Sequence, residues 1–155
     1  MDARQKQLVQ ESFAKVAPIA DTAAALFYGR LFELDPSIRP MFPRDLKEQG
    51  RKLMNMLTLA VRGLDRPDQL IPAVQALGRR HAGYGVMPHH YRTVGSALLW
   101  TLKEGLGEAY TPEVRSAWIA VYSLLSTTMQ EAAAEVPDSQ PAMEANTSEP
   151  VSSEA

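Results

Sequence analysis

The sequence predicts an all-α fold. Apolar residues recur at spacings of three and four along several long segments, which is the period of an amphipathic helix. Proline and glycine fall between these segments, and no segment shows the sustained alternation of a half-buried strand. With 155 residues, 45% of them hydrophobic, the chain has the size of one domain. We therefore expect about six or seven helices packed around one core.

The first two helices are separated by Pro18. A stripe of apolar residues before it predicts the first helix: Val9, Phe13 and Val16. The second helix is expected over about 21–34, because Ala24, Tyr28 and Leu31 share one face. It should end at Asp35, since the residue before a proline avoids the helical region.

The middle of the chain combines short turns with two longer helices. Pro40 and Pro43 restrict the stretch around Met41 and Phe42 to short turns. A helix is expected over about 46–64, where apolar residues again follow one stripe: Leu53, Met56, Leu57, Ala60 and Leu64. After a turn at 65–68, a further stripe predicts the next helix: Leu70, Val74, Leu77 and His81.

Glycine and proline mark the boundaries of the last two helices. Gly83 and Gly85 should end the helix that carries His81, and Pro88 suits the first turn of a helix that runs to about Glu104. Thr111-Pro112-Glu113 provides a cap, a first-turn proline and a first-turn acid for a final helix that ends near 135.

The segment 136–155 differs in composition from the rest of the chain. It contains three prolines and four acids, but no lysine, arginine or aromatic residue. Residues 1–135 therefore carry 16 basic and 14 acidic residues, a net charge of +2, although the whole chain has −2. A segment so poor in apolar residues cannot offset its ordering entropy. We expect one domain at 1–135 and a disordered acidic tail at 136–155.

Composition excludes several classes of protein. Without cysteine there is no disulfide framework, thiolate metal site or cysteine nucleophile. The charge of −2 gives no overall basic field for nucleic acid or an anionic membrane. The first residues lack the apolar core of a signal peptide, and no apolar run reaches the roughly 18 residues of a membrane span. We therefore expect a cytoplasmic protein that binds neither nucleic acid nor membrane.

Few motifs suggest chemistry. The Glu-x-x-His pairs of di-iron bundles, the G-x-S-x-G elbow and the Walker loop are all absent from the sequence. His81 is the interesting residue, because it completes an apolar stripe and should face the core. From its spacing alone, two interpretations stay open: a core histidine bonded to the backbone, or a metal ligand such as haem iron requires.

Several segments together resemble the globin family, over about residues 5–135. These are FYGRLFELDP at 27–36, LGRRHAGYGV at 77–86, YRTVG at 91–95, GEAYTP at 107–112 and AWIAVY at 117–122. The resemblance is greatest to the lineage that joins neuroglobin-like proteins with bacterial flavohaemoglobins and single-domain haemoglobins. It implies a globin fold around a haem b cofactor.

The resemblance also implies roles for individual residues. His81 matches the proximal histidine that ligates the iron, with its other ring nitrogen donating to a carbonyl near Leu77. Phe42 matches the phenylalanine that packs on the porphyrin. Gln49, Leu53 and Tyr28 match the distal side, where the gas ligand binds.

Gln49 departs from the neuroglobin-like pattern, which has histidine at this position. A glutamine amide is a poor iron ligand, so we expect an open or water-filled distal site rather than coordination by two histidines. Tyr28 and Gln49 would then offer a hydroxyl and an amide as hydrogen-bond donors to the gas ligand.

Further roles have structural alternatives that stay open. Tyr91 and Glu135 match a flavohaemoglobin pair that bonds the proximal histidine, or they are a core tyrosine and a solvated terminal acid. Lys52 or Arg51 would pair with a haem propionate, or lie on a solvated helix face. His89 and His90 are expected to be exposed.

Three functions follow from the resemblance. The first is reversible binding of O₂, and of NO or CO. The second is nitric-oxide dioxygenation, for which the sequence contains no flavin and nicotinamide domain, so a separate reductase would be the partner. The third is a haem-based gas sensor. Both a monomer and a homodimer are compatible with the sequence, because no exposed apolar stripe stands out.

Overall fold

The computed structural model describes residues 2–135, and its regular elements in that range are six α-helices and three short 3₁₀ helices. In chain order they are α1 (Ala3–Val16), η1 (Ala17–Ile19), α2 (Ala20–Leu34), η2 (Pro36–Met41), α3 (Lys47–Gly63), α4 (Pro67–Gly83), α5 (Pro88–Leu106), η3 (Gly107–Ala109) and α6 (Pro112–Ala133). The predicted all-α class is confirmed. The tail predicted at 136–155 lies outside the described residues.

Local side chains account for several helix ends. Asp2 and Gln5 form a reciprocal capping box at the start of α1, with bonds of 2.8 and 3.1 Å. The Thr111 hydroxyl accepts a bond of 3.2 Å from the Val114 backbone N–H at the start of α6. Pro18 does end α1, but the chain continues directly through η1 into α2. The proline therefore produces a tight turn rather than a gap between helices.

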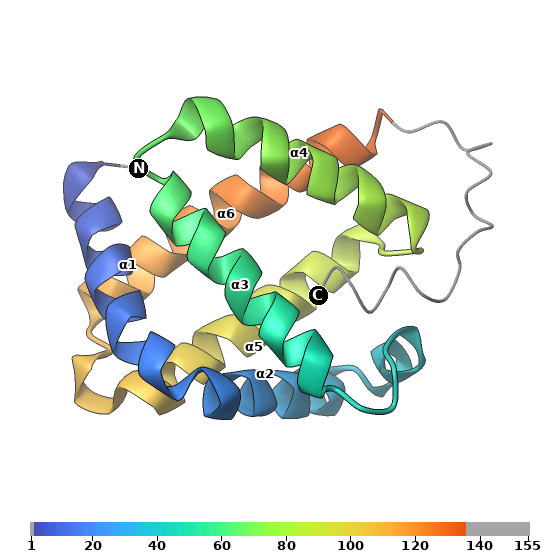
Figure 1. Cartoon of the computed structure of the whole chain (residues 1–155), viewed down its shortest axis with the longest axis horizontal. Helices are drawn as coiled ribbons and strands as arrows, with labels where there is room; N and C mark the ends of the chain where they lie inside the picture. The colour runs from blue at the N-terminus through green and yellow to red at the C-terminus, as the bar shows by residue number, and fades with distance from the viewer. Residues whose placement is uncertain (1, 136–155) are drawn as a thin grey trace.

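Long helices pack in pairs (Figure 1). α4 crosses and packs against α6, α2 packs against α5, and α1 contacts both α5 and α6. α3 crosses the view in front and contacts α1, α2 and α4. Between the described ends of the chain, no helix is both long and apolar enough to cross a membrane.

Two glycines allow close helix crossings. A Cβ added to Gly78 in α4 would lie 2.6 Å from the Met129 Cα in α6. A Cβ added to Gly50 in α3 would lie 2.9 Å from the Ala24 Cβ in α2. Ordinary contacts between carbon atoms are about 3.5–4.0 Å. Both crossings therefore depend on the missing side chain, and each brings together two helices that contribute to the site described next.

Candidate functional site

A large pocket lies in the core, lined mostly by apolar side chains from the α-helices α2 to α6, with η2 and the turn after α4. Its lining comprises Phe27, Tyr28, Leu31, Ile38, Met41, Phe42, Leu53, Met56, Leu57, Ala60, Val61, Val74, Leu77, His81, Tyr84, Val86, His90, Tyr91, Val94, Leu98, Trp118, Val121, Tyr122, Leu125 and Met129. Five of the seven residues that the sequence proposed for the site are among them: Tyr28, Phe42, Leu53, His81 and Tyr91.

His81 projects from the last turn of α4. Its ring Nδ1 lies 3.0 Å from the Leu77 carbonyl oxygen, and since a carbonyl can only accept, Nδ1 donates. The hydrogen is thus on Nδ1, and Nε2 keeps its lone pair. Burial lowers the pKa of His81 to about 4, the Leu77 bond partly opposes this, and the charge of Arg80 adds to it. The ring is neutral at neutral pH, and its open surface faces the pocket.

Tyr28 brings a hydroxyl into this pocket from α2. The side chain is 3% exposed, and its hydroxyl has no hydrogen-bond partner within the described part of the chain. Burial raises the pKa of Tyr28 far above its usual value, and the nearby Gln49 side chain lowers it to a smaller extent. Gln49 is thus near enough to change the pKa of the hydroxyl, but no hydrogen bond of good geometry joins the two side chains. The hydroxyl can therefore still donate a hydrogen bond to another group.

Gln49 is buried beside Tyr28 rather than in the wall of the pocket. It is 1% exposed, and it is not one of the lining residues. Its position follows from the close contact of the next residue, Gly50, with Ala24, which draws α3 against α2.

Phe42 follows η2 and belongs to an aromatic cluster. Its ring meets those of Tyr28 and Phe32 at angles of 63° and 64°, with centroids 5.5 and 5.6 Å away. The Arg39 guanidinium lies over Phe32, 5.0 Å from its centroid. It also donates to the carbonyls of residues 42, 43 and 44 at 3.4, 2.8 and 3.0 Å. Arg39 therefore fixes the segment that carries Phe42, a role that the sequence did not reveal.

Tyr91 lines the pocket from the first turn of α5 and is 8% exposed. The Tyr122 hydroxyl donates a bond of 2.7 Å to the Tyr91 carbonyl, which ties α5 to α6. Burial raises the pKa of Tyr91. Glu135 is exposed, and its side chain forms no hydrogen bond or ion pair with another residue of the range 2–135. The predicted bonding of Tyr91 and Glu135 to His81 stays a prediction.

The charged candidates on α3 lie outside the pocket. Lys52 is half-buried and is not a lining residue, and Arg51 is exposed and pairs with Glu48 at 3.2 Å. Their proposed contact with a propionate stays a prediction.

Of the two neighbouring histidines, His89 is exposed as expected, whereas His90 is half-buried and borders the pocket. The Met87 backbone N–H donates to His90 Nδ1 at 2.8 Å, which holds the ring at the rim. No sequence pattern predicts this placement, because the bond depends on the path of the backbone into α5.

The pocket fits the haem group that the sequence resemblance implies. Its walls are apolar, as a porphyrin requires, and one neutral imidazole with a free lone pair is available for iron. A buried hydroxyl without a partner is rare in proteins and points to a polar group that it could meet. His81 would hold the iron, and Phe42 would contact the ring.

Comparisons with known proteins agree with this architecture. The family model "Globin" matches residues 25–129. The chain is 28% identical over 129 residues to the flavohemoprotein of Bacillus subtilis, covering 81% of this chain and 32% of that protein. It is 29% identical over 143 residues to the neuroglobin of Tetraodon nigroviridis, covering 83% and 90%.

A solved structure is also similar. It is an engineered carbene transferase, described as a putative nitric oxide dioxygenase from Rhodothermus marinus, with a TM-score of 0.77 and 27% identity. The match covers 87% of this chain and 94% of that one. The chain thus spans about a third of the flavohemoprotein but nearly all of the neuroglobin. With a helical fold, a histidine-bearing apolar pocket and a family model that covers most of its length, the chain belongs to the globin family.

Proposed function

We propose that the protein is a haem b-binding globin that reversibly binds O₂, NO or CO, with His81 as the only protein ligand of the iron. The observation that carries this proposal is the combination, in one apolar pocket, of a neutral imidazole and a buried tyrosine hydroxyl without a partner. When bound, haem would supply an iron centre that takes up a diatomic gas.

His81 would act through its fixed tautomer. The bond from Nδ1 to the Leu77 carbonyl keeps Nε2 unprotonated and prevents rotation of the ring. Because the pKa is about 4, protons do not compete for Nε2 near neutral pH. The close contact of α4 with α6 at Gly78, one turn before His81, gives the ligand a rigid support.

Tyr28 would select and retain the gas. Its hydroxyl can donate to a bound ligand that carries negative charge, and such bonds contribute about 1.5–3 kcal/mol. Gln49 is close enough to influence this hydroxyl and provides a second polar group on the same side. The walls of the pocket around this hydroxyl are mostly apolar.

Two measurements test this proposal. The purified protein should show an intense Soret band, and His81→Leu should lose or strongly alter it. Tyr28→Phe should release O₂ about ten to a hundred times faster, while CO, which is less polar, should change less. Tyr110→Phe is the matched control, because Tyr110 is half-buried but does not line the pocket. An O₂ dissociation rate that is unchanged in Tyr28→Phe would refute the role of the hydroxyl.

Nitric-oxide dioxygenation is the second candidate. It is favoured by the likeness to flavohemoproteins and to the putative nitric oxide dioxygenase. The reaction combines one NO, one O₂ and one electron into one nitrate, so it requires a reductase as a partner. The ferrous protein in O₂-containing buffer should then form many equivalents of nitrate from NO when a reductant is supplied. Formation of a single equivalent would leave gas binding as the function.

A further inference from the structure

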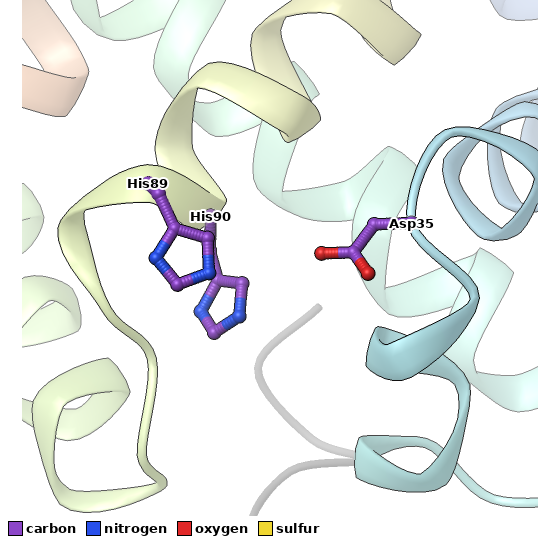
Figure 2. Close-up of side chains that lie close together, drawn as sticks. All are labelled: Asp35, His89 and His90. Carbon is purple, nitrogen blue, oxygen red and sulfur yellow. The ribbon is translucent and has the colours of Figure 1, made fainter.

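A second group of possible metal ligands lies outside the contacts proposed for haem. Asp35 lies between α2 and η2, whereas His89 and His90 lie in the first turn of α5. Figure 2 shows the carboxylate of Asp35 directed toward the two neighbouring rings. One donor atom from each of the three residues lies within 4.8 Å of the other two. The proposed function assigns no role to any of them.

The donor groups of His89 and Asp35 are available to a ligand. The His89 ring makes no hydrogen bond with any other described residue, and it lies 4.2 Å from the His90 ring between centroids. Asp35 Oδ1 accepts bonds from the Ser37 backbone N–H at 3.1 Å and from the Ser37 hydroxyl at 2.5 Å. These bonds orient the carboxylate and lower the pKa of Asp35, which keeps it ionised. Burial is the main cause that lowers the pKa of His90, so that ring is neutral near neutral pH.

We propose that Asp35, His89 and His90 form a surface site for a divalent transition metal, with Zn²⁺ as the best match. Two imidazoles and one carboxylate are donors that zinc prefers, whereas Ca²⁺ and Mg²⁺ take oxygen ligands. Three protein ligands leave a fourth position for water. Bonds of about 2.0–2.1 Å require donors about 3.3 Å apart in a tetrahedral site. The donor atoms, which lie within 4.8 Å of one another, must therefore approach by up to about 1.5 Å.

The carboxylate is essential to this site. The N-terminus of α5 carries a partial positive charge that disfavours a cation, and imidazole ligands bring no negative charge to offset it. Asp35 supplies the negative charge from a different part of the chain. Metal binding also disturbs a hydrogen bond of the free protein. Because the Met87 backbone N–H donates to His90 Nδ1, the ring hydrogen of His90 is on Nε2. Coordination through Nε2 requires this hydrogen to move to Nδ1, which breaks the Met87 bond.

Metal binding would join two segments that meet at the rim of the pocket. Asp35 precedes η2, which contributes Ile38 and Met41 to the lining, and His90 is itself a lining residue. A bridge between them restrains both sides of the rim. It should therefore raise the thermal stability of the chain whether or not the pocket is filled.

Titration calorimetry of the full chain with ZnCl₂ tests the proposal. We expect one Zn²⁺ per chain, and an affinity at least about tenfold weaker in Asp35→Asn and in His89→Gln. Asp45→Asn is the matched control, because Asp45 is an exposed carboxylate that, like Asp35, accepts a bond from the backbone N–H two residues on, here at 3.0 Å. At a hundredfold excess of Zn²⁺ over its dissociation constant, the melting temperature should rise by roughly 5–10 °C.

NMR provides a second measurement that does not depend on a variant. The ring signals of His89 and His90 should shift on addition of Zn²⁺ in the haem-free chain, in a one-to-one titration. Absence of saturable binding up to millimolar Zn²⁺ would overturn the proposal. So would an affinity that Asp35→Asn and His89→Gln leave unchanged, or one that Asp45→Asn weakens equally.

Discussion

Replacing Gly78 by alanine should lower the free energy of unfolding by about 2 kcal/mol. The new methyl group would lie 2.6 Å from the Met129 Cα and 2.8 Å from its carbonyl carbon. These are backbone atoms of α6, so they cannot move aside as a flexible side chain would. Relief requires α4 and α6 to separate by about 1 Å, since carbon atoms pack at about 3.5–4.0 Å. Such overpacking costs up to about 3 kcal/mol, and the higher helix propensity of alanine offsets about 1 kcal/mol.

Urea unfolding followed by circular dichroism measures this change. With an m-value of about 2 kcal/mol per molar urea, the midpoint should fall by about 1 M at unchanged slope. Gly29→Ala is the matched control, because Gly29 is also inside a helix but has nothing within 4 Å of its added Cβ. It should stabilise the protein by up to about 1 kcal/mol. If Gly78→Ala also raised the midpoint, the close crossing inferred for α4 and α6 would be refuted.

Three other perturbations have defined outcomes. Ser12→Ala removes the acceptor of the buried Trp118 indole N–H, a bond of 2.8 Å, and should cost about 1–3 kcal/mol in the same urea assay. In the haem-free protein, the pKa of His81 is about 4 in the folded state and about 6.5 in the unfolded state. The contribution of this difference to the free energy of unfolding is therefore fully present above pH 6.5. It is lost as the pH falls toward 4, which lowers the free energy of unfolding by up to about 3 kcal/mol. Thermal unfolding at several pH values checks this, and a slope that persists unchanged in His81→Phe would contradict it. Arg39→Met removes the hydrogen bonds to the backbone carbonyls of residues 42, 43 and 44. It should speed haem transfer to an acceptor globin about tenfold. An unchanged rate would show that these bonds do not position Phe42.

The helices were predictable because their ends carry local signals. The proline of α6, the cap at Thr111 and the break at Asp35 act through neighbouring residues, so the sequence alone indicates them. Pro72 gave no such guidance, since it lies inside α4 rather than at an end. It is the sixth residue of that helix, where the loss of one backbone bond is tolerated by packing against α6.

The placement of residues in the pocket lining was predictable only where periodicity or resemblance defines a residue. His81 followed from its stripe, and its bond to Leu77 spans a single helical turn. The unpaired hydroxyl of Tyr28 and the placement of Gln49 outside the lining depend on how closely α3 approaches α2. The meeting of Asp35 with the α5 histidines depends on tertiary docking, which no local pattern encodes.

The residues that line the pocket lie between 27 and 129, so its walls come from every α-helix after α1. Whatever fills it therefore holds together segments that are remote in the chain, and stabilises all of them at once by mass action. Cofactor supply would then set protein abundance: chains made when haem is scarce would unfold more often and be removed by proteases, so the amount of globin would follow the amount of haem without a dedicated regulator.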